Sequence, residues 1–235
     1  MHIVITGASK GIGFAIAKKF ADDKQGHTIY ICSREEESLK RAAIQLQARF
    51  PRSNIYHKTC DMSNTESILS FAKWLLNFQN AIDVLVNNAG QFVPGSVHNE
   101  PEGALEKMIE VNVYSAYHLT RALLPKMMQQ QGGHIFNMCS IASLKAYDNG
   151  GAYSISKFAL AGFTKNLREE MKPHNIKVTA VYPGATMSDS WSGANINPKR
   201  IMEAEDIAQL IYTASFLSPQ ACVEDIIVRP QLGDL

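Results

Sequence analysis

The sequence has no long apolar run and no block of like charges. No stretch reaches the roughly 20 apolar residues that a transmembrane helix needs. The formal net charge is +1, which argues against nucleic acid or an anionic membrane surface as the main partner. The N-terminus opens on an apolar, strand-like run and not on a signal peptide. We therefore expect a cytoplasmic protein that binds neither nucleic acid nor membrane.

Cysteine is scarce, and the few cysteines show no functional spacing. Cys32, Cys60, Cys139 and Cys222 form no C-x-x-C pair and no metal-ligand pattern with histidine. Cysteine is often buried, and disulfides are rare in reducing compartments. We expect ordinary buried thiols and no metal site.

Internal repeats, low-complexity tracts and Pro/Gly-rich linkers are also missing, while strand-like and helix-like segments alternate throughout. Most strand candidates are continuous runs rich in Ile and Val, typical of parallel strands buried on both faces. This alternation predicts one α/β domain over 1–235, with a doubly wound, mainly parallel seven-stranded sheet between two helix layers. The strands are expected at 2–6, 28–32, 54–60, 83–87, 134–139, 177–182 and 225–228.

Helical periodicity fills the gaps between these strands. Ser63 is predicted to cap one helix, with Glu66 three residues later completing a capping box. Pro125 is expected to interrupt the longest helical segment. The helices are expected at 12–21, 35–50, 63–78, 101–131, 152–171 and 203–217.

A glycine-rich turn joins the first strand to the first helix, in the run Thr6-Gly7-Ala8-Ser9-Lys10-Gly11-Ile12-Gly13. Glycine permits the tight turn and a close approach of the backbone to a pyrophosphate, and the free N–H groups at the helix start bind the anion. The turn therefore predicts nucleotide binding over a plain tight turn. The expected contacts are Gly7, Ser9, Lys10, Gly11, Ile12 and Gly13.

The end of the second strand should meet the ribose of the adenosine. Ser33 and Arg34 stand there, where a carboxylate would instead favour NAD, and Lys10 is close in the phosphate loop. Two cations and a hydroxyl suit a 2′-phosphate, so NADP(H) is favoured over NAD(H). The alternative is that Arg34 is a surface charge opening the next helix, where it would oppose the helix dipole.

Tyr153 and Lys157 are four residues apart in a predicted helix, so they share one face. A lysine ammonium beside a phenol should lower the phenol pKa from about 10 and suit it to acid–base chemistry. Ser140 ends an apolar strand and could hold a carbonyl oxygen beside the phenol. The alternative for the pair is an exposed lysine over a half-buried tyrosine.

These motifs, in this order and over almost the whole length, resemble the compact, single-domain branch of the short-chain dehydrogenase/reductase family, which has a Rossmann-like fold. The resemblance implies a catalytic tetrad of Asn112, Ser140, Tyr153 and Lys157. It also implies cofactor contacts from Asp61 to the adenine ring, from Thr186 to the nicotinamide carboxamide, and from the turns that contain Asn88, Ala89, Gly90, Pro183 and Gly184.

The resemblance implies an NADP(H)-dependent reductase of a small carbonyl compound, or the reverse alcohol dehydrogenase. Tyr153 would exchange the proton, Lys157 would lower the phenol pKa and bind the nicotinamide ribose, and Asn112 would hold a water that leads to solvent. The alternatives are a catalytically silent NAD(P)-binding regulator, a sugar-nucleotide epimerase and a methyltransferase. The substrate stays open among 3-oxoacyl thioesters, pterins, steroid-like ketones and small dicarbonyls.

The residues around the substrate are less well defined. The segment 185–200 is expected to form a lid, with Met187, Trp191 and Ile196 as its apolar anchors. The residues expected to border the pocket are Gln91, Phe92, Val93, Leu144, Lys145 and Tyr147. The tail from 225 to 235 resembles family members whose last strand helps to build a homodimer or homotetramer.

Overall fold

The computed structural model describes residues 1–187 and 197–233, and its centre is a seven-stranded sheet. The strands lie in the order β3-β2-β1-β4-β5-β6-β7, and each neighbouring pair is parallel. This confirms the predicted sheet, with strand ends shifted by at most one residue. The strands are β1 (His2–Thr6), β2 (Thr28–Ser33), β3 (Asn54–Thr59), β4 (Val84–Asn87), β5 (Gly133–Met138), β6 (Ile176–Pro183) and β7 (Asp225–Val228).

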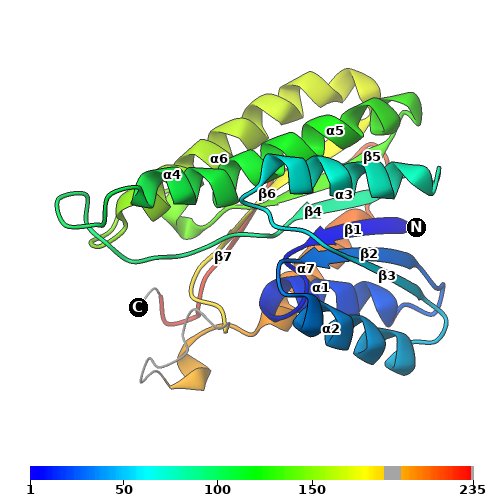
Figure 1. The fold of residues 1–235 in the computed structure, drawn as a ribbon, viewed down its shortest axis with the longest axis horizontal. Coiled ribbons are helices and arrows are strands. Elements are labelled where there is room, and N and C mark those ends of the chain that lie inside the picture. The colour runs from blue at the N-terminus through cyan, green and yellow to red at the C-terminus, as the bar shows by residue number, and fades with distance from the viewer. Residues whose placement is uncertain (188–196, 234–235) are drawn as a thin grey trace.

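Helices cover both faces of the sheet, which gives the expected three layers (Figure 1). One layer holds α1 (Gly11–Ala21), α2 (Glu36–Arg49) and α7 (Ala204–Ser215). The other layer holds α3 (Thr65–Asn77), α4 (Ala104–Ile109), α5 (Ser115–Gln129) and α6 (Gly151–Met171). The architecture is the Rossmann-like doubly wound fold.

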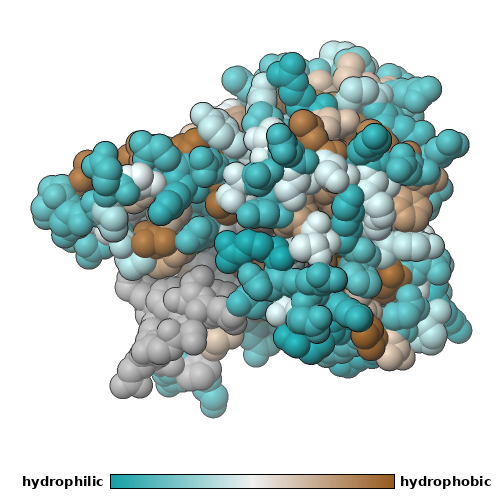
Figure 2. All heavy atoms as spheres, viewed as in Figure 1, coloured by the Kyte–Doolittle hydropathy of each residue, from teal (hydrophilic) through white to brown (hydrophobic). Residues whose placement is uncertain are grey.

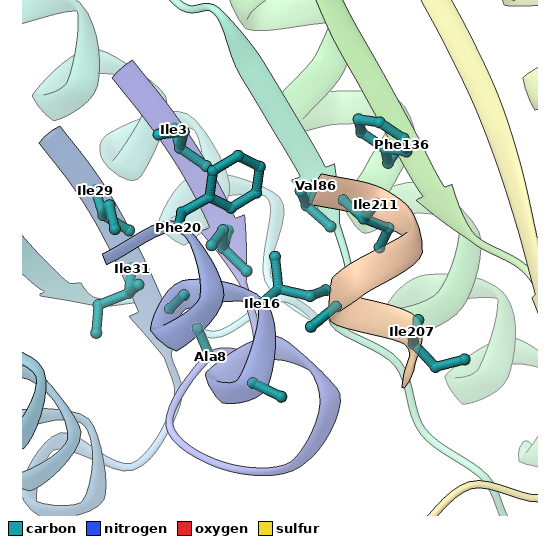
Figure 3. Packing of buried hydrophobic residues seen from close by; sticks show 14 of the residues in the cluster. Ile3, Ala8, Ile16, Phe20, Ile29, Ile31, Val86, Phe136, Ile207 and Ile211 are labelled. Atoms are coloured by element: carbon teal, nitrogen blue, oxygen red, sulfur yellow. The ribbon is translucent and has the colours of Figure 1, made fainter. Parts of the chain in front are cut away.

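Successive residues of the central strands bury their side chains on opposite faces. Ile3 and Ile5 pack on the side of α1 and α7, whereas Val4 between them packs on the side of α3 and α5. Figure 3 shows the first of these cores, where Ile16 and Phe20 of α1 meet the strands. Because both faces are covered, these strands read as continuous apolar runs and show no polar alternation.

The start of α3 differs from the prediction. Asn64, not Ser63, is the N-cap, and its side-chain oxygen accepts a hydrogen bond from the Ser67 N–H at 2.9 Å. The Ser63 hydroxyl instead donates to Asp61 Oδ1 at 2.8 Å. The helix begins one residue later than a Ser63 cap requires, because Asp61 engages Ser63 in a turn of its own.

The segment 101–131 also differs from the prediction. Pro125 lies inside α5 and does not interrupt it, because it is exposed on the helix surface, where water can satisfy the carbonyl that its missing N–H leaves unbonded. The interruption lies earlier, at a π-helical turn over Glu110–Tyr114 between α4 and α5. Such turns add a residue to the helix and often occur at functional sites.

The prediction of four buried thiols is wrong for one cysteine. Cys32, Cys60 and Cys139 are buried, whereas Cys222 is exposed. The three buried residues stand at or just after the ends of strands, inside the core. Cys222 stands in the connection between α7 and β7, on the surface of the molecule.

The face in Figure 2 is largely hydrophilic, with apolar side chains scattered among the polar ones. Within 1–187 and 197–233, no helix combines the length and hydropathy of a membrane span. The same residues contain no cluster of three or more His, Cys, Asp or Glu side chains placed to hold a metal ion.

The cap of α3 gives a test of this local structure. Asn64→Ala removes the side-chain acceptor and should lower the free energy of unfolding by about 1 kcal/mol. Ser63→Ala is the matched control and should cost clearly less, since Ser63 is exposed and its side chain bonds only the neighbouring carboxylate of Asp61. Urea unfolding followed by circular dichroism measures both. Equal losses in the two variants would contradict the assignment of Asn64 as the cap.

Candidate active site

A cavity of about 530 Å³ opens where β4, β5 and β6 end. The carboxyl ends of parallel strands meet at one edge of a sheet, and doubly wound folds bind their ligands at that edge. Residues that follow these strands line the cavity together with residues of α1 and α6. Nine of the predicted site residues are in the lining: Ile12, Asn88, Gly90, Ser140, Tyr153, Lys157, Pro183, Gly184 and Thr186.

Ser140 and Tyr153 meet in this cavity from different elements. Ser140 follows β5 and starts a 3₁₀ helix at Ile141–Ser143, where its Oγ accepts a hydrogen bond from the Ala142 N–H at 3.1 Å. Tyr153 lies in the first turn of α6, and its hydroxyl lies near enough to Ser140 for the serine to lower the pKa of the phenol. Phe92 packs edge-on against the Tyr153 ring, with 4.8 Å between the ring centroids. A carbonyl oxygen can accept one hydrogen bond from each hydroxyl.

Lys157 lies one turn beyond Tyr153 on α6. The prediction that it lowers the pKa of the Tyr153 phenol is wrong for this structure. The Lys157 Nζ donates to the carbonyl of Met138 at 2.7 Å and lies 5.8 Å from the centre of the Tyr153 ring. Burial raises the pKa of Tyr153, and the nearby Ser140 side chain offsets this only in part. Burial also lowers the pKa of Lys157 to about 8. The phenol therefore keeps its proton at neutral pH.

Asn112 lies in the π-helical turn and is 1% exposed. Its Oδ1 accepts from the Gln91 N–H at 2.7 Å, and its Nδ2 donates to the Gln91 carbonyl at 3.0 Å and to Ser156 Oγ at 2.9 Å. A Cβ at Gly90 would lie 3.1 Å from Asn112 Oδ1 and 3.4 Å from Lys157 Nζ. Asn112 therefore fixes the turn after β4 against α6, and Gly90 leaves room between the amide and the ammonium group.

The turn after β4 also holds the glycine-rich loop. Thr6 Oγ1 accepts hydrogen bonds from the N–H groups of Asn88 at 3.0 Å and Ala89 at 2.9 Å. Asn88 Nδ2 in turn donates to the carbonyls of Thr6 at 2.9 Å and Gly7 at 3.1 Å. The Asn88 amide is thus engaged with the protein backbone, which makes it a brace for the loop.

The loop and the start of α1 fit a dinucleotide pyrophosphate. Gly7 and Gly11 have positive φ angles of 64° and 57°, a conformation that glycine adopts at no steric cost. Within the described residues, no side chain caps the N-terminus of α1, so its N–H groups face the loop where Ser9 and Lys10 stand. A Cβ at Gly13 would lie 2.5 Å from the Gly7 carbonyl oxygen, so only glycine permits this close packing.

Ser33, Arg34 and Asp61 lie together at the carboxyl ends of β2 and β3, outside the 530 Å³ cavity. Hydrogen bonds from Ser63 lower the pKa of Asp61, and the positive charge of Arg34 adds to this effect. The Arg34 side chain is 70% exposed, with its Nε 3.4 Å from Glu35 Oε1. Because α2 begins at Glu36, Arg34 stands in the connection between β2 and α2 and not in the first turn of the helix.

The turn after β6 closes the remaining side of the cavity. The Gly184 N–H donates to the Val228 carbonyl of β7 at 2.8 Å, and Thr186 Oγ1 donates to the Gly184 carbonyl at 2.9 Å. The Met187 N–H then bonds the Met202 carbonyl at 2.8 Å, which anchors the start of the predicted lid. Residues 188–196, with Trp191 and Ile196, lie outside the described part of the chain.

Of the six residues expected to border the pocket, four line the cavity, namely Gln91, Phe92, Lys145 and Tyr147, whereas Val93 and Leu144 are not in its lining. Burial raises the pKa of Tyr147 to about 12, and the nearby Tyr153 hydroxyl adds to the shift. Sequence reasoning missed Arg229, which also lines the cavity. Arg229 directly follows the last predicted strand, so it could have been predicted at the carboxyl edge of the sheet, where the other site residues lie.

A family model described as short chain dehydrogenase matches residues 1–199. Among curated proteins, the 3alpha-hydroxysteroid dehydrogenase of Mediterraneibacter gnavus is 32% identical over 215 residues, which are 87% of this chain and 85% of that protein. The sepiapterin reductase of Chlorobaculum tepidum is 30% identical over 239 residues, covering 99% of this chain and 97% of that protein.

Solved structures agree with this match. A metagenomic short-chain oxidoreductase in complex with NADP is 30% identical, with a TM-score of 0.83 over 98% of this chain and 97% of that one. The chain therefore belongs to the short-chain dehydrogenase/reductase family and is an oxidoreductase of that family.

Gly13 allows a test of the packing under the phosphate loop. Gly13→Ala should lower the free energy of unfolding by about 1–3 kcal/mol, because the new methyl group meets the Gly7 carbonyl. Gly162→Ala is the matched control on α6, where a Cβ meets nothing within 4 Å. The control should gain about 1 kcal/mol from helix propensity. Urea unfolding of both variants measures the difference, and a stable Gly13→Ala protein would contradict this packing.

Proposed function

We propose that this protein is an NADP(H)-dependent carbonyl reductase, or the reverse alcohol dehydrogenase, with Tyr153 as its general acid/base. The observation that carries the proposal is the meeting of Ser140, Tyr153 and Lys157 in one cavity beside the turn Pro183–Thr186. The two relatives named above, a sepiapterin reductase and a hydroxysteroid dehydrogenase, are named for carbonyl or alcohol chemistry, and this supports the same reaction class here.

The residues present would hold a dinucleotide along the carboxyl edge of the sheet. Gly7, Ser9, Lys10, Gly11 and Gly13 would bind the pyrophosphate at the start of α1. Asp61 would contact the adenine ring. Pro183, Gly184 and Thr186 would position the nicotinamide, and Lys157 its ribose. Ile12, Asn88, Ala89 and Gly90 would form the wall between these two groups.

A nicotinamide cofactor would supply the hydride. Ser140 and Tyr153 would hold the substrate oxygen with two hydrogen bonds. Tyr153 keeps its proton at neutral pH because burial raises the pKa of its phenol, and it would donate that proton to the oxygen as charge develops. Lys157 would accept or release protons readily, since burial lowers its pKa to about 8. Asn112 would connect the lysine to solvent through a bound water.

The proposal of NADP(H) over NAD(H) rests on Ser33 and Arg34. Arg34 is mostly exposed at the end of β2, where its guanidinium can turn toward a 2′-phosphate. Lys10 supplies a second cation from the loop. The bound NADP of the metagenomic relative supports the same choice.

The homodimer or homotetramer and the cytoplasmic location stay predictions. The strand β7 forms one edge of the sheet, and its Ile227 is 56% exposed. An exposed edge with apolar residues is commonly covered by another chain, which supports the predicted assembly.

Tyr153→Phe tests the acid/base assignment. The variant keeps the ring that packs on Phe92 but loses the proton, so kcat should fall by about 10²–10⁴. Binding of NADPH, measured by fluorescence, should stay unchanged. Tyr56→Phe on the outer strand β3 is the control and should keep full activity. A Tyr153→Phe enzyme with near-normal turnover would rule out the phenol as the proton donor.

Arg34→Asp tests the cofactor choice. The substitution removes a cation and adds a charge that repels a 2′-phosphate, so the ratio of kcat/KM for NADPH over NADH should fall at least about tenfold. Arg41→Asp, on the exposed face of α2, makes the same change in net charge and should leave the ratio unaltered. An unchanged ratio in Arg34→Asp would remove this arginine from cofactor selection.

A further inference from the structure

The helix that carries the proposed proton donor begins without a cap of its own. The N-cap of α6 is Gly150, which has no side chain, and the first turn of the helix contains no acidic residue. The N–H groups at a helix start have no partner inside the helix, and they attract negative charge. Tyr153 lies in this first turn, so its position depends on the groups that hold the turn from outside.

Glu100 holds this turn from a different part of the chain. Its Oε2 accepts a hydrogen bond from the Ala152 N–H at 3.0 Å, although the two residues are 52 positions apart. Glu100 is half-buried. A hydrogen bond from a helix N–H to a carboxylate is stronger than one between neutral groups. The Glu100 carboxylate therefore does for α6 what an N-cap side chain does for other helices.

The glycine at the first position of α6 leaves room for this contact. A Cβ at Gly151 would lie 2.5 Å from Glu100 Oε2 and 2.4 Å from the Gly95 carbonyl oxygen, which is far inside van der Waals contact. Gly151 also has a positive φ of 23°. A larger residue at this position would push the helix and Glu100 apart.

The segment 91–100 contacts the start of α6 at other points as well. Phe92 packs edge-on against the Tyr153 ring, with 4.8 Å between the ring centroids. The Gly95 N–H donates to the Asn149 carbonyl at 3.1 Å, just before the helix begins. The segment therefore contacts the phenol ring and also the backbone that leads into its helix.

We infer that Glu100 is a positioning residue for the proposed acid/base reaction, because its carboxylate fixes the first turn of α6 and so the place of the Tyr153 hydroxyl beside Ser140. The inference rests on the proposed role of Tyr153. Proton transfer depends steeply on the placement of the donor. The glycine-rich loop is held separately, by the bonds of Thr6 to the turn after β4. Loss of the carboxylate should therefore slow turnover and leave cofactor binding intact.

Glu100→Ala tests the inference, with NADPH and the fastest substrate found in a panel of ketones, aldehydes and dicarbonyls. The variant loses the acceptor for the Ala152 N–H, so kcat should fall about tenfold while the KM for NADPH changes less than about twofold. Glu100→Gln keeps an oxygen that accepts the same hydrogen bond and should recover most of the lost turnover.

Glu102→Ala is the matched control for these variants, because it removes the same charge from an exposed neighbouring position. It should keep the turnover of the unmodified protein. A Glu100→Ala enzyme as fast as this control would overturn the inference. Equal losses in Glu100→Ala and Glu100→Gln would also overturn it, since the hydrogen bond would then not be the cause.

Gly151→Ala changes the same contact from the helix side. Its methyl group should displace Glu100 Oε2 and lower kcat by a similar factor. Gly162→Ala, farther along α6, is the control, because a Cβ there meets nothing within 4 Å. Equal turnover in these two variants would contradict the inference. The pair also keeps the test open if Glu100→Ala fails to fold.

Hydrogen exchange separates this inference from the proposed function. Mass spectrometry follows the exchange of the amide hydrogens in 150–157 in the protein without cofactor. Glu100→Ala should lose protection there, whereas Glu100→Gln and Glu102→Ala should keep it. Unchanged protection in Glu100→Ala would overturn the inference. A protein that oxidises no NADPH or NADH with any carbonyl compound would overturn the reductase function, and the exchange would still decide whether Glu100 holds the first turn of α6.

Discussion

The side-chain amide of Asn112 is 1% exposed and, besides a weak bond to Met108 Sδ, makes three hydrogen bonds to nitrogen and oxygen atoms on which the geometry of the site depends. Two bonds fix the backbone of Gln91 after β4, and the third reaches Ser156 on α6. Ser156 in turn donates to the Tyr153 carbonyl at 2.7 Å. Loss of a buried amide partner leaves unsatisfied polar groups on both sides, which costs about 1–3 kcal/mol for each group. One side chain thus joins a strand end to the helix that carries the phenol.

The same turn is held from its other side. Asn88 and Ala89 bond Thr6 and the glycine-rich loop, while Gln91, a few residues later, bonds Asn112. The expected pyrophosphate site and the expected proton donor are therefore fixed to one short stretch of backbone. A reaction that needs two groups within a few tenths of an ångström benefits from this, because thermal motion of the turn moves both attachment points together.

Much of this arrangement could be predicted from the sequence. The continuous apolar runs gave the strands to within a residue, because both faces of the sheet are covered and polar alternation is absent. The spacing of Tyr153 and Lys157 predicted that they share one helix face, and Ser140 was predicted to end a strand beside the phenol. The sequence could not show which of two neighbouring side chains would cap α3, because this depends on competition between nearby hydrogen-bond partners. Asp61 engages Ser63, so the cap of α3 passes to Asn64.

The pKa of Tyr153 shows a second limit. A spacing of four residues shows that a lysine and a tyrosine share a helix face, but not which partner the ammonium group selects. Here the Lys157 ammonium group donates to the Met138 carbonyl of β5. Burial meanwhile raises the pKa of Tyr153 and lowers that of Lys157. Arg229 was missed for a related reason, because only the parallel pairing of β7 with β6 brings the end of that strand to the cavity.

The strand order has a consequence for how the protein is made. Synthesis runs from the N-terminus, so β1, β2 and β3 are made first, but the core on their α1 side is completed only by Ile207 and Ile211 of α7. The cavity likewise needs the Val228 carbonyl and Arg229, which are made long after Ser140 and Tyr153. A nascent chain therefore cannot close either the core or the cavity until its last elements have left the ribosome. Pairing of β7 with β6 then supplies the last wall of the binding site.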